Sequence, residues 1–148
     1  MDRNDNHLPK TKRVLIAEDS VVLGDVIRFN FQRAGCEPTL ARNGREALER
    51  LSSEPFDLLL SDYEMPEVDG AELCRRVRDE LFLTEIPIIL CTAKCLEINQ
   101  AQLKAKYSLA AILCKPFSMR DLTALSLRII NSDSIERSSP DHRFVPSN

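Results

Sequence analysis

The stretch LLLSDYEMPEVDG, residues 58–70, ends a hydrophobic segment on a carboxylate. Three leucines and a serine lead into Asp62, and a Met-Pro pair and a second Asp-Gly follow. A run of consecutive apolar residues is typical of a strand that is buried on both faces of a parallel sheet. We therefore expect a buried strand with Asp62 at its tip. A helix over residues 70–81 should follow, capped by Asp69 and Glu72.

The rest of the chain alternates short apolar runs with segments of helical periodicity. Strands are expected within residues 13–20, 36–41, 86–92 and 110–114, and helices over residues 21–34, 44–51, 96–107 and 118–130. Strands separated by helices predict a parallel sheet covered on both faces, an α/β (βα)5 three-layer sandwich. The 148 residues, 43% of them hydrophobic, suffice for one such domain. We place it at residues 13–131, between a flexible N-terminal tail (1–12) and a disordered C-terminal tail (132–148).

Charge and hydropathy exclude two classes of partner. The net charge is -3 and the Lys and Arg residues are scattered among acids, so no basic face for nucleic acid is expected. No apolar run approaches the roughly 20 residues of a membrane-spanning helix, and the polar N-terminus does not resemble a signal peptide. We expect a cytoplasmic protein that binds neither nucleic acid nor membrane.

Five cysteines are present: Cys36, Cys74, Cys91, Cys95 and Cys114. Their odd number and irregular spacing without a CxxC motif argue against a disulfide framework or a zinc site. We interpret them as small buried hydrophobic side chains. A redox role remains the alternative for the last three, which could lie close together.

Four predicted strands end in side chains able to do chemistry: Glu18 and Asp19, then Asp62, Thr92 and Lys115. Each alone has an ordinary explanation as a helix cap, a strand-closing threonine or a solvated lysine. In a parallel sheet, however, all of them meet at one edge. Three adjacent carboxylates repel unless a cation neutralises them, and carboxylate oxygens suit Mg²⁺. The set therefore predicts phosphoryl transfer onto Asp62 as the nucleophile.

These residues and the segments VLIAEDS, NGREAL, DLLLSDYEMPEVDG, PIILCTA and CKPF resemble the receiver domains of two-component response regulators. The match covers residues 13–130 in the family's order and spacing, and the resemblance is to the stand-alone, single-domain type. It implies a flavodoxin-like fold with strand order 2-1-3-4-5. It also implies that the chain is not an enzyme, beyond self-catalysed phosphotransfer and autodephosphorylation.

The resemblance assigns a role to each site residue. Asp62 would receive a phosphoryl group from a sensor histidine kinase or a histidine phosphotransfer protein. Mg²⁺ would bind Glu18, Asp19, Asp62 and the backbone carbonyl of Glu64. Thr92 and Lys115 would contact the phosphoryl oxygens, Thr92 would swing toward them, and the bond from Lys115 to Pro116 would be cis.

Three positions depart from the family or vary within it. Ile112 stands three residues before Lys115, where the family usually has Tyr or Phe as a rotameric switch, and Tyr107 does not align with that position. Glu64 and Lys94 flank the expected site. They are either two solvated side chains or a gating pair that hinders the water that hydrolyses the acyl phosphate.

Too little sequence follows residue 130 for a DNA-binding output domain, so we expect the signal to leave through protein contacts. The face of the fourth helix, fifth strand and fifth helix is the candidate surface, for a downstream target or for a homodimer.

Two alternative functions remain. One is a receiver-like interaction module that is never phosphorylated. The other is a haloacid dehalogenase type phosphatase, which needs an aspartate two residues after the nucleophile, where this chain has Glu64.

Overall fold

The computed structural model describes the backbone of residues 10–138 and the side chains of residues 10–132. Strands and helices alternate in the order β1 (Arg13–Ala17), α1 (Val21–Arg33), β2 (Glu37–Ala41), α2 (Gly44–Ser53), β3 (Leu58–Asp62), α3 (Gly70–Asp79), β4 (Ile88–Thr92), α4 (Gln100–Tyr107), β5 (Ala111–Cys114) and α5 (Met119–Ser138). The five strands form one parallel sheet in the order β2-β1-β3-β4-β5. The predicted fold class and strand order are confirmed.

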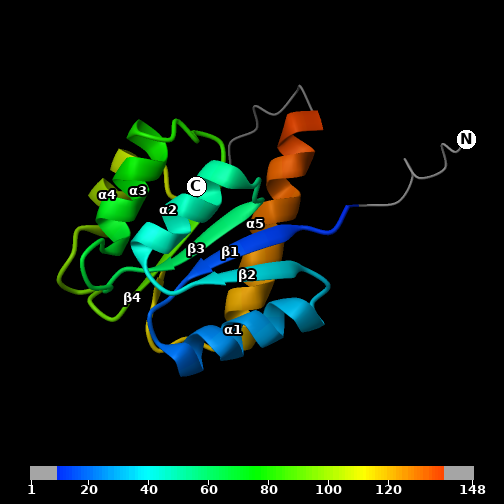
Figure 1. The fold of residues 1–148 in the computed structure, drawn as a ribbon, viewed down its shortest axis with the longest axis horizontal. Coiled ribbons are helices and arrows are strands. Elements are labelled where there is room, and N and C mark those ends of the chain that lie inside the picture. Colours follow the sequence, from blue (N-terminus) through cyan, green and yellow to red (C-terminus); the bar gives the residue numbers. More distant parts are fainter. Residues whose placement is uncertain (1–9, 139–148) are drawn as a thin grey trace, which may run out of the picture.

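The sheet is the middle of three layers (Figure 1). Helices α1 and α5 pack on one face and α2, α3 and α4 on the other, and each face has its own hydrophobic cluster. Strand β1 shows the alternation, because Leu15 joins the first cluster and its neighbours Val14 and Ile16 join the second. All five residues of β3 and all five of β4 are buried. The two strands are therefore rigid supports for the residues at their ends.

Helix starts follow from side-chain caps. Side-chain caps are observed at three helix starts, because each side chain accepts a hydrogen bond from the N–H group three residues later: Asp69, as predicted above, and also Asn43 and Ser118. Helix α4 begins at Gln100, not at residue 96 as predicted. Asn99 caps it by accepting a hydrogen bond from the N–H group of Gln102, and Leu96 is fully exposed in the preceding loop.

Helix α5 is longer than the sequence pattern indicates. It reaches Ser138 rather than ending at residue 130, so it continues into the segment from residue 132 that was expected to be a tail. No proline occurs between Met119 and Ser138, and nothing else there forces a helix to stop. The tail predictions for residues 1–9 and 139–148 lie outside the described residues. Among the helices of residues 10–138, none has both the length and the apolar character needed to cross a bilayer.

Candidate functional site

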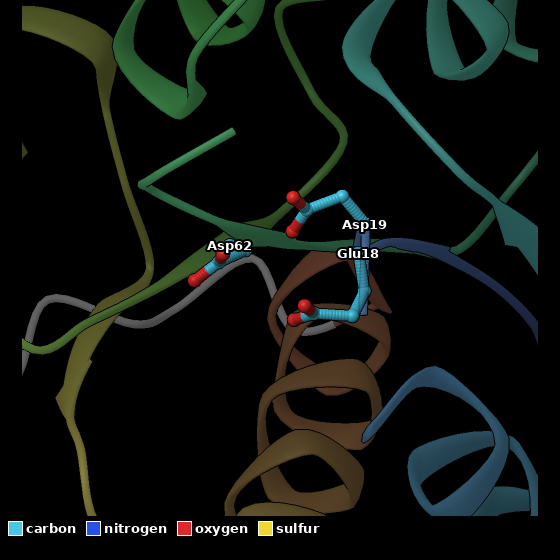
Figure 2. Close-up of side chains that lie close together, drawn as sticks. All are labelled: Glu18, Asp19 and Asp62. Atoms are coloured by element: carbon cyan, nitrogen blue, oxygen red, sulfur yellow. The ribbon is translucent and has the colours of Figure 1, made fainter. Parts of the chain in front are cut away.

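Three carboxylates meet at the C-terminal edge of the sheet. Glu18 and Asp19 directly follow β1, and Asp62 ends β3, whose Ser61 lies in register with Ala17 of β1. Each acid offers a carboxylate oxygen, and these oxygens all lie within 4.8 Å of one another. In Figure 2 the side chains of Glu18 and Asp19 extend on the same side, toward Asp62. The structure thus brings together acids that are more than 40 positions apart in sequence.

Burial dominates the electrostatics of this cluster. Glu18 and Asp62 are each only 5% exposed. Desolvation raises the pKa of Glu18 to about 6, against the lowering effect of the Ser20 N–H group, which donates to its carboxylate at 3.0 Å. Burial likewise raises the pKa of Asp62, although the Lys115 ammonium opposes this shift. Both carboxylates are therefore costly to ionise without a further cation.

Lys115 supplies one positive charge, because its Nζ lies 2.8 Å from Oδ1 of Asp62. Burial lowers the pKa of Lys115, but the adjacent negative charge of Asp62 outweighs it, so the net shift is upward. Oδ1 of Asp62 is fully buried, and no hydrogen bond of good geometry reaches it within the described part of the chain. The carboxylate oxygens of Glu18, Asp19 and Asp62, with Oδ1 of Asp62 lacking a well-formed hydrogen bond from the described residues, fit a small divalent cation that prefers oxygen ligands.

Thr92 ends β4, next to Asp62 in the sheet, because Asp62 is in register with Cys91. Its hydroxyl donates to Oε2 of Glu64 at 2.6 Å and accepts from the backbone N–H of Lys94 at 2.9 Å. Among the described residues, the side chains of Glu64 and Lys94 form no ion pair with each other, and Glu64 is bonded to Thr92 instead. A gating role for Glu64 or Lys94 stays a prediction. Sequence reasoning missed the contact between Thr92 and Glu64.

The remaining predicted positions lie on β5 and just after it. Ile112 is half-buried and packs against the cluster that includes residues of α2, α3 and α4, so it contributes an aliphatic surface where the family usually has an aromatic ring. The peptide bond from Lys115 to Pro116 is cis, as the resemblance implied. Whether Ile112 changes the response to phosphorylation stays a prediction.

Gly70 packs directly behind the site. A Cβ atom at this position would lie 2.7 Å from the carbonyl oxygen of Asp62 and 2.7 Å from Cα of Tyr63. The N–H group of Gly70 also donates to the carbonyl of Tyr63 at 2.9 Å. Only a glycine lets α3 start this close to the end of β3, so the glycine of the sequence LLLSDYEMPEVDG sets the position of Asp62.

The prediction that all five cysteines are small buried hydrophobic side chains is confirmed for Cys74 and Cys91 but not for Cys95 and Cys114. Cys74 and Cys91 are buried and Cys36 is partly buried, but Cys95 and Cys114 form a disulfide with a Cα–Cα distance of 5.8 Å. The bond itself was not predicted, although the redox alternative named both residues, which are 19 positions apart. They become neighbours only through the register that places Cys114 beside Thr92.

Comparisons with known proteins agree with this geometry. The family model described as "Response regulator receiver domain" matches residues 14–126. The transcriptional regulatory protein CrdR of Helicobacter pylori is 39% identical over 127 residues, which are 84% of this chain and 58% of CrdR. BaeR of Escherichia coli, also a transcriptional regulatory protein, is 36% identical over 77% of this chain and 46% of its own length. This chain thus spans about half the length of these relatives.

Solved structures give the same result for the fold. The chemotaxis response regulator CheY4 of Vibrio cholerae superimposes with a TM-score of 0.73 at 29% identity, covering 81% of this chain and 99% of CheY4. The receiver domain of the sensor histidine kinase PA1611 from Pseudomonas aeruginosa has a TM-score of 0.73 at 26% identity, with 82% and 99% covered. That structure contains a magnesium ion coordinated in its active site cleft. The fold, the edge of the sheet where the acids meet and the family match lead to one conclusion: this chain belongs to the response regulator receiver domain family.

Proposed function

We propose that this chain accepts a phosphoryl group on Asp62 in a Mg²⁺-dependent reaction and passes the signal on through protein contacts. The proposal rests on the groups that surround Asp62. Its carboxylate is buried beside two further acids and beside Lys115, and its Oδ1 has no well-formed hydrogen bond in the described structure. A carboxylate in such a place is suited to react with an electrophile whose charge the surrounding groups stabilise.

The chemistry follows from the residues at the site. Glu18, Asp19, Asp62 and the backbone carbonyl of Glu64 would hold Mg²⁺, which when bound supplies charge to offset the carboxylates and the phosphoryl oxygens. A carboxylate oxygen of Asp62 forms the new bond to phosphorus. At the same time the bond from phosphorus to the donor's imidazole nitrogen breaks and the electron pair stays on the imidazole, which takes up a proton. Lys115 stays beside the reacting carboxylate and offsets the added negative charge.

Thr92 supplies the second phosphoryl contact only after a change of partner. Its hydroxyl is occupied by Glu64 in this structure, so it must leave that carboxylate to donate to a phosphoryl oxygen on Asp62. The N–H group of Lys94 is bonded to the same hydroxyl, so the loop after β4 is coupled to this movement. A phosphoryl group on Asp62 would therefore act, through Thr92 and Lys94, on the backbone that leads into α4.

We further propose that the phosphoryl donor is a sensor histidine kinase or a histidine phosphotransfer protein that docks on α1. This helix starts immediately after the acidic pair and its cap Ser20, so a protein that reaches Asp62 with a phosphohistidine must cover this end of the domain. Its outward face carries exposed apolar side chains, among them Val22, which is 75% exposed, and Phe29, which is 56% exposed. Exposed side chains of this type are the usual anchors of a protein interface.

The output surface is proposed to be the face of α4, β5 and α5, for a downstream protein or a second copy of the chain. Helix α4 is mostly exposed, with Tyr107 as its buried residue among the described ones. It follows the loop that is bonded to Thr92, so a shift of Thr92 changes this face first. Sedimentation of the unphosphorylated and phosphorylated chain will measure whether a homodimer forms.

The phosphatase alternative has less support. It requires an aspartate two residues after the nucleophile to act as a general acid, and this chain has Glu64 there. The carboxylate of Glu64 accepts a hydrogen bond from Thr92 instead of facing a leaving group. The family match also favours a signalling domain.

The test is phosphorylation with small donors. Purified chain is incubated with Mg²⁺ and either acetyl phosphate or phosphoramidate, and its intact mass is measured. We expect the wild type and Asp79→Asn, which changes an exposed aspartate at the end of α3, to gain one phosphoryl group each. Asp62→Asn should gain none. A phosphoryl group on Asp62→Asn, or an unmodified wild type with both donors, would contradict the proposal.

A further inference from the structure

The disulfide between Cys95 and Cys114 joins the two backbone segments that carry Thr92 and Lys115. Cys95 lies three residues after Thr92, in the loop between β4 and α4, and Cys114 immediately precedes Lys115. Thr92 and Cys114 are register partners across β4 and β5, and the Lys115 N–H group donates to the Thr92 carbonyl at 2.8 Å. The bond therefore fastens a loop beside the proposed phosphoryl site to the neighbouring strand end.

The two cysteines differ from the other three in accessibility. Cys114 is exposed and Cys95 is partly exposed, whereas Cys74 and Cys91 are buried. Burial raises the pKa of Cys74 and of Cys91 to about 12, so neither forms the thiolate that exchanges with disulfides. Disulfides that solvent and small thiols reach are the labile and regulatory class, whereas buried ones are structural.

We propose that Cys95 and Cys114 are a reversible oxidation site whose oxidant is a low-molecular-weight disulfide, and that the bond slows phosphorylation of Asp62. The thiolate of one cysteine attacks the small disulfide and releases one small thiol. The second cysteine then displaces the other thiol and closes the protein bond. The two protein thiols lose two electrons in total, and the small disulfide gains them and becomes two thiols. The two protons of the protein thiols pass to the released small thiols.

The direction of the effect follows from the contacts of the loop. With the bond formed, the Thr92 hydroxyl is held by Glu64 at 2.6 Å and by the N–H group of Lys94 at 2.9 Å. Cys95 follows Lys94 directly, so the bond to Cys114 restrains the residues that must move when Thr92 turns toward Asp62. The Nε2 atom of Gln100, at the start of α4, donates to the Cys95 carbonyl at 3.4 Å. Reduction frees the loop and the beginning of α4 together.

The effect on phosphorylation rests on the function proposed above, whereas formation of the bond does not. Bond formation is measured first, by incubating the chain with oxidised or reduced glutathione, denaturing it, alkylating it and weighing it. We expect three alkylated cysteines in the oxidised chain and five in the reduced chain. Cys36→Ser should keep this difference of two, and the double variant Cys95→Ser, Cys114→Ser should lose it. Five alkylated cysteines in both glutathione forms would overturn the proposal.

The consequence is measured on the same samples. Phosphorylation of Asp62 by acetyl phosphate should be about fivefold or more slower in the oxidised wild type than in the reduced one, and equally fast in both samples of the double variant. Amide hydrogen exchange of residues 93–99 should be faster in the reduced wild type, and this readout needs no phosphorylation. Equal phosphorylation rates or equal exchange in the two forms would refute the restraint. If neither form is phosphorylated, the proposed function fails and hydrogen exchange alone decides whether the bond restrains the loop.

Discussion

Glu18 should destabilise the metal-free domain at neutral pH. The pKa of its carboxyl is raised from 4.5 to about 6 in the fold, chiefly because the side chain is buried. Between these pH values the folded chain retains a proton that the unfolded chain has lost. The free energy of unfolding therefore falls as the pH rises from 4.5 to 6 and stays lower above 6. At 1.36 kcal/mol per pKa unit, the loss is about 2 kcal/mol.

Glu18→Gln removes the charge while its amide oxygen can still accept the hydrogen bond from Ser20. In the presence of EDTA at pH 7 this variant should be more stable than the wild type by about 1 to 2 kcal/mol. Saturating Mg²⁺ should reverse the order, because the wild type gains about 2.7 kcal/mol at one hundred times the dissociation constant and the variant lacks a ligand. The acidic cluster thus lowers the stability of the metal-free protein and allows the folded protein to bind a cation.

Urea unfolding followed by far-UV circular dichroism measures both effects, since the chain has no tryptophan to report by fluorescence. The control is Glu97→Gln, which changes an exposed glutamate in the loop before α4. The control should match the wild type at each pH, with and without Mg²⁺. The reasoning fails if Glu18→Gln is no more stable than the wild type in EDTA at pH 7, or if Mg²⁺ stabilises both equally.

Three further predictions concern the rest of the site. Gly70→Ala should lose about 1 to 3 kcal/mol of unfolding free energy, because its Cβ would meet backbone atoms. Gly24→Ala should lose less, because its Cβ would meet a leucine side chain. Urea titration compares the unfolding free energies of the two variants. Thr92→Ala should slow phosphorylation by acetyl phosphate by about ten- to hundredfold, and Thr92→Ser should restore most of the rate. Phe29→Ser should slow transfer from a phosphohistidine protein but not from acetyl phosphate. Phe82→Ser, which changes another exposed phenylalanine on the loop after α3, should slow neither. Equal transfer rates for these two phenylalanine variants would exclude α1 as the docking surface.

Much of the fold and of the site could be predicted because the decisive residues stand at strand ends. A parallel sheet places all its C-terminal ends on one edge, so locating β1 and β3 also placed Glu18, Asp19 and Asp62 near one another. The caps at Asn43 and Asp69 were predictable for a similar reason, since they depend on contacts within four residues. These features need only the order of elements or local spacing.

The features that were missed depend on register and on side-chain rotamers. The bond between Cys95 and Cys114 requires knowing which residues of β4 and β5 lie opposite one another. The hydrogen bond from Thr92 to Glu64 depends on the rotamers of two side chains, where opposite charge had suggested a different partner, Lys94. The end of α5 was misplaced because a polar segment lacks an apolar stripe even when it continues a helix.

The central claim is that Asp62 is the residue that carries the phosphoryl group. An acyl phosphate is reduced by borohydride to the alcohol, so a phosphorylated aspartate becomes homoserine, which peptide mass spectrometry locates. After incubation with acetyl phosphate and Mg²⁺, borohydride should convert residue 62 and no other aspartate. Without Mg²⁺ the conversion should be lost. Homoserine at another position, or an unchanged residue 62 in a chain whose mass shows a phosphoryl group, would contradict the account.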